Sequence, residues 1–383
     1  TDSGALTITG TSSFTTSANN ATIALDTTTN AFTGAVTITT NDDSGTDADV
    51  TIDGGTTALV LAASTIDGDL TVINGNSITD IGTVTVGGNL AATTDANNGL
   101  INLGTLAVDG TVALTTNGSG NATAVNDAGL TFVASTVGGN LSATATTGNM
   151  TDSGSLTIAG TSSFTTSANN ADITLNNNNA FTGAVALNTT GSTGDARIDN
   201  GTTALILAAS SVGGQLRVRS GNSITDSGTV TVGQAFFATT DANNGVINLD
   251  QLAVDGVVVL ATNGSGNATV VNDAGLTLHA KTQTVGGNLT ATATTGNIED
   301  SGTGLTIAGT SSFTTSTNNA DIILDDTRHA FTGAVTLNTS GSTGNATIDN
   351  GTTALNIAAS SVGGNLTLTS GAAAGITDSG TLT

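Results

Sequence analysis

What this chain lacks excludes several classes of protein before any motif is considered. Among its 383 residues there is no cysteine, proline, tryptophan or tyrosine. The absence of cysteine excludes disulfides, thiolate metal ligands and thiol nucleophiles. The absence of tryptophan and tyrosine removes the usual aromatic platforms on which enzymes stack sugars. The absence of proline suits a sheet in which nearly every backbone N–H donates to a neighbouring strand.

Charge is scarce and almost all of one sign. Charged residues are 9% of the chain, whereas about 25% is typical of globular domains. There are 29 acidic and 5 basic residues, which give a formal net charge of −24. Such a surface repels nucleic acid and anionic lipid and attracts cations. We therefore expect no nucleic-acid partner. Because no apolar run is long enough to cross a bilayer, we also expect no membrane insertion.

What the chain does contain points to an all-β fold. Apolar residues make up 37% of the chain, and glycine accounts for 51 positions. Thr, Val and Ile favour strands, whereas Gly, Asn and Asp favour tight turns. Helix formers such as Glu, Lys and Gln are nearly absent.

A long internal repeat organises the sequence. Phe14, Phe164 and Phe313 have almost identical surroundings, which gives a period of about 150 residues. Residues 6–155, 156–304 and 305–383 are therefore copies of one super-repeat, the third of them truncated. Both ends of the chain fall inside a copy, so we expect an excerpt from a longer array. Repetition at a fixed period is the signature of a solenoid, in which each unit buries its apolar face against its neighbours.

Each super-repeat divides into six shorter segments, most of them about 25 residues long. A segment carries three short apolar clusters separated by turn residues, and within a cluster apolar residues alternate with Thr, Ser or Ala. This pattern predicts one continuous right-handed parallel β-helix (a β-solenoid) over residues 1–383, with about 25 residues and three strands per coil and about 15 coils. A sandwich of antiparallel strands is the main alternative. It is disfavoured because the same turn residues recur once per coil.

Asparagine recurs just before the third apolar cluster of most segments. Because Asn tolerates the left-handed backbone conformation, we predict a tight corner at these positions. Stacked Asn side chains can also form hydrogen bonds along the axis. The positions are Asn20, Asn76, Asn98, Asn121, Asn149, Asn170, Asn222, Asn244, Asn267, Asn297 and Asn319.

Aspartate recurs after the third cluster in 13 of the 15 segments. One interpretation is that each carboxylate accepts backbone N–H groups at a turn and faces solvent. The other is that the carboxylates form a column bridged by cations, with Ca²⁺ the expected cofactor because it prefers oxygen ligands. The positions are Asp26, Asp53, Asp80, Asp127, Asp152, Asp199, Asp226, Asp250, Asp273, Asp300, Asp325, Asp349 and Asp378.

One acidic loop is longer than its counterparts in the other copies. It carries four carboxylates close together in the sequence, at Asp42, Asp43, Asp47 and Asp49. These could hold one Ca²⁺, although they match no EF-hand pattern. A solvated acidic loop is the alternative interpretation.

The residues that catalysis needs are sparse. The two histidines, His279 and His329, have no counterpart in the other copies and are interpreted as variation at outward positions. Arg217 and Arg219 flank Val218 on one strand, so we expect both to face solvent. Solenoid enzymes that cleave acidic polysaccharides need clustered carboxylates and basic residues in a cleft bounded by long loops, and we see no such arrangement. The sequence therefore predicts a protein that is not an enzyme.

A third class is ice binding, because flat solenoids can present Thr-x-Thr rows. The central Thr of the first cluster recurs in most segments, which favours such a row. The regularity is broken by Val60, Ala107, Ile206, Ala253 and Asn356. Ice binding is therefore kept as a minor alternative.

The repeats resemble those of the filamentous-haemagglutinin-like and related giant β-strand-repeat exoproteins of bacteria. Units such as Gly154-Ser155-Leu156-Thr157-Ile158-Ala159-Gly160 and Thr136-Val137-Gly138-Gly139-Asn140-Leu141 carry the resemblance, which covers all the coils. It implies an exported rod that acts in adhesion, biofilm or surface coating, located outside the cell at the bacterial surface.

We therefore expect a structural or adhesive rod of a large extracellular bacterial surface protein or fibre. The alternative is the protomer of a surface sheath, filament or lattice whose acidic faces pack through bridging cations. The expected partners are further copies or coils of the same chain, end to end or side by side, and a host-cell or polysaccharide surface.

Overall fold

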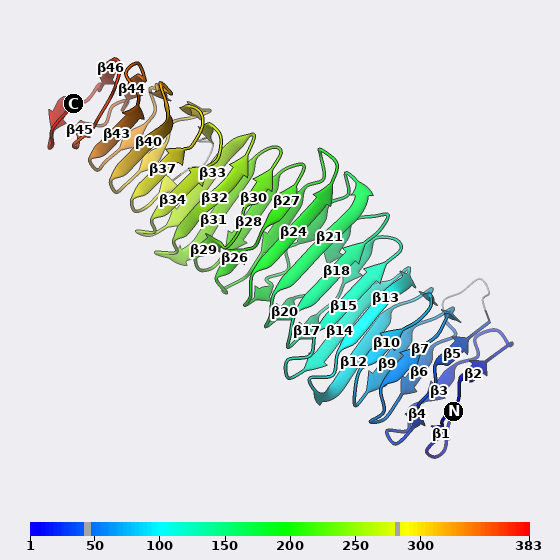
Figure 1. Ribbon diagram of the computed structural model, residues 1–383. Helices are drawn as coiled ribbons and strands as arrows, with labels where there is room; N and C mark the ends of the chain where they lie inside the picture. Colours follow the sequence, from blue (N-terminus) through cyan, green and yellow to red (C-terminus); the bar gives the residue numbers. More distant parts are fainter. Residues whose placement is uncertain (42–46, 280–283) are drawn as a thin grey trace. The chain divides into compact units, whose positions relative to one another are not determined.

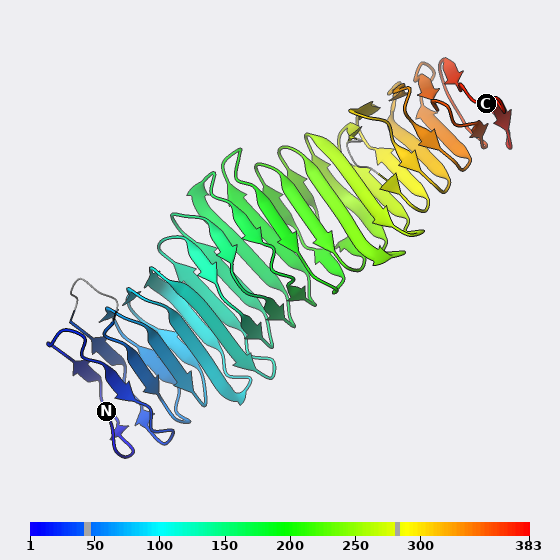
Figure 2. The same cartoon turned by 180° about the vertical axis from the view of Figure 1, so that it is seen from behind.

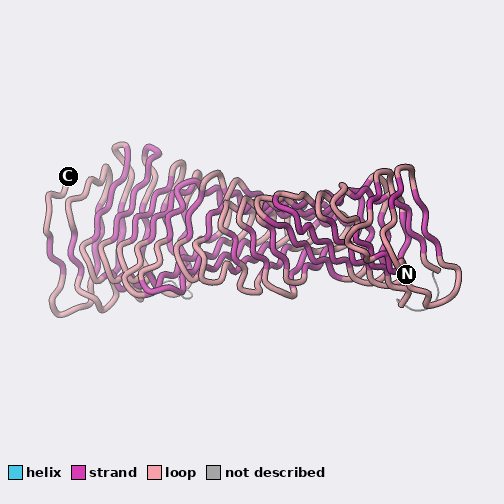
Figure 3. Tube along the Cα trace, turned by 90° about the horizontal axis from the view of Figure 1, so that it is seen from below, coloured by secondary structure: helices cyan, strands magenta, loops and turns pink. Residues whose placement is uncertain are grey.

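The computed structural model describes residues 1–41, 47–279 and 284–383. They form two units, Thr1–Thr190 and Gly191–Thr383, and each is considered by itself. Within each unit the described residues form strands and turns without any helix, as Figure 3 shows by colour. No helix of the described residues is long and apolar enough to cross a membrane.

Two parallel sheets face each other in the first unit (Figure 1, residues coloured blue to green). One contains β3 (Ile23–Leu25), β6 (Val50–Asp53), β9 (Leu70–Asn74), β12 (Leu90–Asn97), β14 (Thr111–Asn117), β16 (Leu130–Phe132), β17 (Ser135–Val137), β19 (Met150–Asp152), β20 (Leu156–Ile158), β22 (Ile173–Leu175) and β23 (Ala180–Phe181). The other contains β2 (Ser12–Thr15), β5 (Val36–Thr39), β7 (Leu59–Leu61), β8 (Ser64–Ile66), β10 (Ile78–Asp80), β11 (Val84–Val86), β13 (Ile101–Val108), β15 (Ala122–Asn126), β18 (Leu141–Ala145), β21 (Ser162–Asn169) and β24 (Val185–Thr190). A separate pair joins β1 (Thr7–Ile8) to β4 (Ala31–Phe32).

The second unit repeats this plan (Figure 2, residues coloured green to red). Its first sheet contains β25 (Ala196–Asp199), β28 (Leu216–Ser220), β31 (Phe236–Asn243), β33 (Val257–Asn263), β35 (Leu276–His279), β38 (Ile298–Ser301), β41 (Ile322–Leu324), β44 (Ala346–Asp349) and β46 (Leu366–Thr369). Its second contains β26 (Leu205–Leu207), β27 (Ser210–Val212), β29 (Ile224–Asp226), β30 (Val230–Val232), β32 (Ile247–Val254), β34 (Ala268–Asn272), β37 (Leu289–Ala293), β40 (Ser311–Asn318), β43 (Val335–Ser340), β45 (Leu355–Ile357) and β47 (Ile376–Asp378). A small sheet joins β36 (Thr284–Val285), β39 (Thr306–Ile307) and β42 (Ala330–Phe331).

The predicted parallel β-solenoid is confirmed, with coils of unequal length. Leu59 pairs with Ile78 across a short coil, whereas Ile23 pairs with Val50 across a clearly longer one. Over the described residues the chain makes about 17 turns, more than the 15 coils that the sequence predicted. Some coils have the three predicted strands. Others have two, because a side formed by β10 and β11 in one coil continues as the single strand β13 in the next.

The super-repeat contains seven turns rather than the six predicted. Seven successive strand pairings lead from β3 to β22, its equivalent in the second copy. The apolar triplets that begin neighbouring segments do not all stack on one another. Leu59 pairs with Ile78, and Val84 pairs with Ser64. The prediction assumed that each triplet lies on the same side of its coil. It therefore assigned strands of different turns to one coil and counted too few turns.

Alternation along each strand separates the core from the surface, as predicted. Ile23, Val50, Leu70 and Leu90 form one inward column, each at most 7% exposed. Their chain neighbours on the outward face, such as Thr51 and Thr71, stay half-buried at the sheet surface. Burying an aliphatic side chain contributes about 1.5–3 kcal/mol, and each coil supplies several such residues only when a neighbour covers them.

The corners confirm part of the asparagine prediction. Five of the eleven predicted corner residues have a positive φ between 60° and 67°, namely Asn20, Asn98, Asn170, Asn244 and Asn319. Others use the side chain instead, and Asn121 Oδ1 accepts the N–H of Asn140 at 2.8 Å, one coil further on. At Asn121 the axial contact thus runs from a backbone N–H to an amide oxygen. An amide–amide contact also occurs, since Asn41 Nδ2 donates to Asn19 Oδ1 at 2.7 Å.

The threonine row expected for ice binding is interrupted, although Thr85 and Thr131 do pair with other threonines. Thr7 pairs with Ala31, and Thr157 pairs with Ala180. The outward threonines that sequence spacing placed in one row therefore sit beside alanines in these coils.

Close contact between successive corners gives a first testable prediction. A Cβ atom added at Gly138 would clash with the carbonyl oxygen of Gly118 in the preceding coil. We expect Gly138→Ala to force these corners apart, with a loss of about 1–3 kcal/mol. Hydrogen exchange over residues 135–145 should become faster. Gly10→Ala is the control, because no atom lies within 4 Å of its added Cβ. Equal exchange in the two variants would show that the corners are not tightly stacked.

Candidate functional site

The predicted aspartate column is not one line, because its members have three different environments. The first group accepts backbone N–H groups from the next coil. Asp80 accepts those of Gly104 and Thr105, at 2.9 and 2.7 Å. Asp152, Asp226 and Asp300 repeat this contact with the residues that follow them by 24 or 25 positions. These carboxylates therefore join successive coils at a place where the strand ladder is interrupted.

The second group caps a turn within its own coil. Asp53, Asp199 and Asp349 each accept the N–H of the glycine two residues on, at 2.8 to 2.9 Å. Those glycines have φ values of 52° to 64°, which a glycine adopts without strain. Burial raises the pKa of Asp53, and the hydrogen bond from Gly55 opposes that rise. Burial likewise raises the pKa of Asp226 in the first group.

The third group lies on the surface. Asp26, Asp127, Asp250, Asp273, Asp325 and Asp378 are exposed. The capping interpretation is thus confirmed for the first two groups, and several caps reach the next coil. Its expectation that these carboxylates face solvent is wrong for Asp53, Asp152 and Asp199, which are buried. Within residues 1–41, 47–279 and 284–383, no group of three His, Asp or Glu side chains is placed to hold a metal ion. Calcium binding stays a prediction.

The acidic loop is only partly within the described residues. Asp42 and Asp43 lie outside them. Asp47 and Asp49 are exposed, and Asp49 Oδ1 accepts the N–H of Asp69 at 2.8 Å, again one coil further on.

The interpretation of His329 as an outward variation is wrong. Its side chain is fully buried, and it takes the place that Asn30 and Asn179 hold in the other copies. His329 Nδ1 accepts the N–H of Leu305 at 2.7 Å, the same role that Asn179 Oδ1 performs for its own coil. Nε2 lies 3.6 Å from the Asp300 carboxylate. The imidazole replaces an amide acceptor in the fold, and this explains why a histidine is tolerated there.

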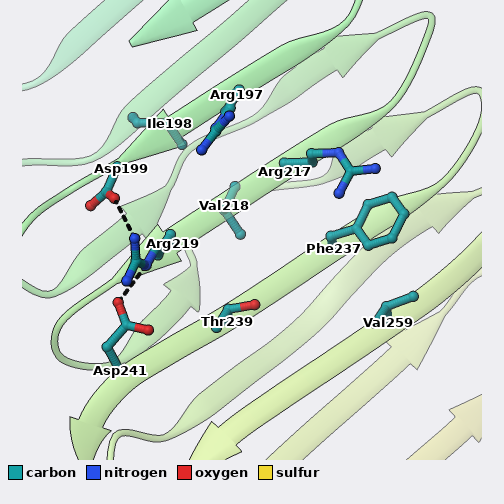
Figure 4. Close-up of a pocket in the computed structure, with 10 residues that line it drawn as sticks. All are labelled: Arg197, Ile198, Asp199, Arg217, Val218, Arg219, Phe237, Thr239, Asp241 and Val259. Atoms are coloured by element: carbon teal, nitrogen blue, oxygen red, sulfur yellow. Dashed lines mark hydrogen bonds and ion pairs between the residues drawn. The ribbon is translucent and has the colours of Figure 1, made fainter. Parts of the chain in front are cut away.

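Positive charge gathers at one place on the second unit. Arg197, Arg217 and Arg219 line a groove of about 540 Å³ on the outer face of β25, β28, β31 and β33 (Figure 4). Strand pairing sets Arg197 beside Arg217 and Arg217 beside Phe237, and Phe237 beside Val259. These four side chains form one outward row across four coils, here called the Arg–Phe row.

Arg219 closes one end of the groove. Its guanidinium donates to Asp241 at 2.5 Å and to Asp199 at 3.4 Å, as the dashed lines in Figure 4 show. The hydrogen bond to Asp241 is the main cause of a raised pKa for Arg219. Because Arg219 and Asp241 are both exposed, their ion pair contributes only about 0–1 kcal/mol. The main effect of the two contacts is to hold Arg219 in place.

The rest of the row is differently occupied. The Arg217 guanidinium stacks 3.8 Å above the Phe237 ring and donates to Gln215 at 3.0 Å. No hydrogen bond or ion pair joins the Arg197 side chain to another residue in the part of the chain that the structure describes. The groove thus presents two guanidinium groups without carboxylate partners, next to an apolar surface.

Sequence reasoning predicted the exposure of Arg217 and Arg219, and the structure confirms it, but it missed the row. Phe237 lies on the outer face of its strand, next to the buried Phe236. A uniform coil of the predicted length would put neither Arg197 nor Phe237 beside Arg217. The coils are shorter here, and the even spacing of these three residues along the chain was the available signal.

A family model described as repeats of unknown function (DUF5649) matches residues 1–39, 47–98, 119–188, 193–261 and 265–338, about four fifths of the chain. No curated protein and no solved structure shows significant similarity to the chain. The last four matched segments begin at positions 47, 119, 193 and 265, which are almost evenly spaced. The inter-coil caps Asp80, Asp152, Asp226 and Asp300 keep nearly the same spacing, so each super-repeat holds two related halves.

The inter-coil caps give the second prediction. Asp80→Ala leaves the N–H groups of Gly104 and Thr105 without their acceptor, which costs about 1–3 kcal/mol locally. We expect faster amide exchange at these two residues, measured by hydrogen–deuterium exchange with peptide resolution. Asp127→Ala, at an exposed position of the same column, should leave exchange unchanged. Similar exchange in the two variants would contradict the capping role.

Proposed function

This chain belongs to the family of repeats of unknown function, and we propose that it is a structural and adhesive shaft of a large extracellular bacterial surface protein. The proposed role needs no catalysis. The repetition of the coils supports this role, because many similar coils give a shaft uniform properties along its length instead of one specialised site.

The observation that carries the proposal is the continuous parallel ladder within each unit. Every coil is bonded to the next through strands on two faces, and the Asp and Asn caps add bonds at the corners. Such an element resists bending and local opening because each coil holds its neighbours. A shaft that carries an adhesive surface away from a cell needs these properties.

The net charge and the composition also support the proposed extracellular location. The net charge of −24 keeps such shafts soluble and separated from one another and from nucleic acid. The chain also has no cysteine that an oxidising environment could alter.

The third prediction tests location and shape together. Electron microscopy of native cells labelled with an antibody against the purified chain should show label along thin projecting fibres. Cells that lack the gene are the control. Label confined to the cell interior, seen only after permeabilisation, would overturn the proposal.

The second candidate function is the protomer of a surface sheath or lattice. Exposed carboxylates such as Asp127, Asp250 and Asp273 favour it, because a cation between two shafts could take ligands from both. The same labelling experiment separates the two, since a sheath would show label over a continuous layer instead of fibres.

Calcium bridging gives the fourth prediction. If Ca²⁺ joins carboxylates between or within shafts, a chelator should lower the melting temperature and disperse lateral assemblies, and added Ca²⁺ should restore both. Added Mg²⁺ is the control, because it keeps its own water ligands more tightly. A melting temperature and an assembly size that are both insensitive to chelator would exclude the cation-bridged model.

A further inference from the structure

The basic residues of this chain are few and unevenly placed. Of the five Arg and Lys residues, three lie on the adjacent strands β25 and β28. With Asp199 and Asp241 included, the groove has three positive and two negative side chains. It therefore carries a net positive charge within a chain of net charge −24.

The fold does not require this arrangement. The equivalent coils of the first copy have Thr51 and Thr71 in the places of Arg197 and Arg217, and Ala91 in the place of Phe237. Those coils form the same parallel pairings. Strand pairing also places two residues of like charge, Arg197 and Arg217, on adjacent strands, which is unfavourable without an anion. The row thus adds a chemistry that packing alone does not explain.

We infer that the Arg–Phe row is a binding site for an anionic polysaccharide, with a carboxylate or sulfate held between Arg197 and Arg217. A guanidinium presents a planar pair of N–H donors that match both oxygens of a carboxylate. Arg197 has no competing partner in the described structure, and Arg217 is oriented by its stacking on Phe237 and its bond to Gln215. Both donors are exposed and face the groove (Figure 4).

The remaining lining of the groove suits the apolar face of a sugar ring. Phe237 is half-buried, whereas Val259, which follows it in the next coil, is buried. The accessible part of the Phe237 ring gives an apolar surface for such contact. The same groove therefore has separate places for the charged group and for the ring.

A polymer fits the row better than a small anion does. The accessible part of the row, from Arg197 to Phe237, crosses three coils, a length of about 10 Å at one strand spacing per coil. Arg197 and Arg217 are exposed and Phe237 is half-buried, so an extended chain can reach all three. Acidic nucleic acids and membranes meet the repulsion of the rest of the surface over a wide area. A thin polysaccharide chain touches only the row.

This inference rests on the proposed function in one respect, because it identifies the adhesive surface of the shaft. Arg219 has a supporting part. Since its guanidinium is held between Asp199 and Asp241, it marks the end of the groove and keeps both carboxylates away from the bound anion.

The test uses the whole chain and isothermal titration with three tetrasaccharides: an oligogalacturonate, a sulfated oligomer and neutral maltotetraose. We expect binding of at least one anionic probe at one site per chain, and none of the neutral one. The variant Arg197→Thr/Arg217→Thr restores the residues of the first copy, so it should fold, and should bind about 10- to 100-fold more weakly. Arg328→Thr removes a positive charge outside the groove and should bind as the wild type does.

A gain-of-site variant tests whether the row is sufficient. Thr51→Arg/Thr71→Arg/Ala91→Phe builds the row on the first copy and should raise the stoichiometry from one site to two. Failure of the wild-type chain to bind either anionic probe, or equal binding by the double Thr variant, would overturn the inference. Release of shortened oligomers during the titration would contradict the proposed function, in which the chain needs no catalytic activity.

These results are independent of cell labelling. Labelled surface fibres without polysaccharide binding would contradict only the inferred binding site and leave the proposed function standing. Binding by a chain found inside the cell would support the site and remove the adhesive role.

Discussion

The backbone ladder between successive coils is the constraint on which the rest of this structure depends. Every strand N–H must find an acceptor in a neighbouring coil, since an unpaired buried donor is costly. Strands meet this need along their length. At the corners they cannot, and there the side chains of Asp80 and Asn121 accept N–H groups from the next coil. Backbone pairing therefore explains the Asp and Asn residues at these corners before any ligand is considered.

The same constraint decides which substitutions the fold tolerates. At one buried position two copies have Asn30 and Asn179 and the third has His329, because all three can accept the N–H that faces them. An aliphatic residue there would fill the space but leave that donor without a partner. The hydrogen bond requires a side chain with an acceptor at this position, and the surrounding core limits the size of that side chain.

The fold was predictable because its two periodicities are visible in the sequence, alternation within strands and repetition along the chain. The number of coils was not, since a side of the coil can be one long strand, as in β13, or two short ones, as in β10 and β11. Both forms have similar apolar clusters. The same error concealed the Arg–Phe row. Arg217 was correctly expected at the surface, but its contacts with Arg197 and Phe237 depend on a coil shorter than the predicted one. For the aspartates, sequence established the turn chemistry but not which coil receives each hydrogen bond.

Repeated coils and a distinct groove on one of the units are compatible because the two faces of a strand are under different constraints. Inward positions must keep the apolar columns continuous from coil to coil, and corner positions must keep their acceptors. Outward positions on the strands meet neither demand. Thr51 and Thr71 in one copy can therefore become Arg197 and Arg217 in another without disturbing a pairing. The proposed binding site thus uses outward positions alone, and a basic row stands out on a chain of net charge −24.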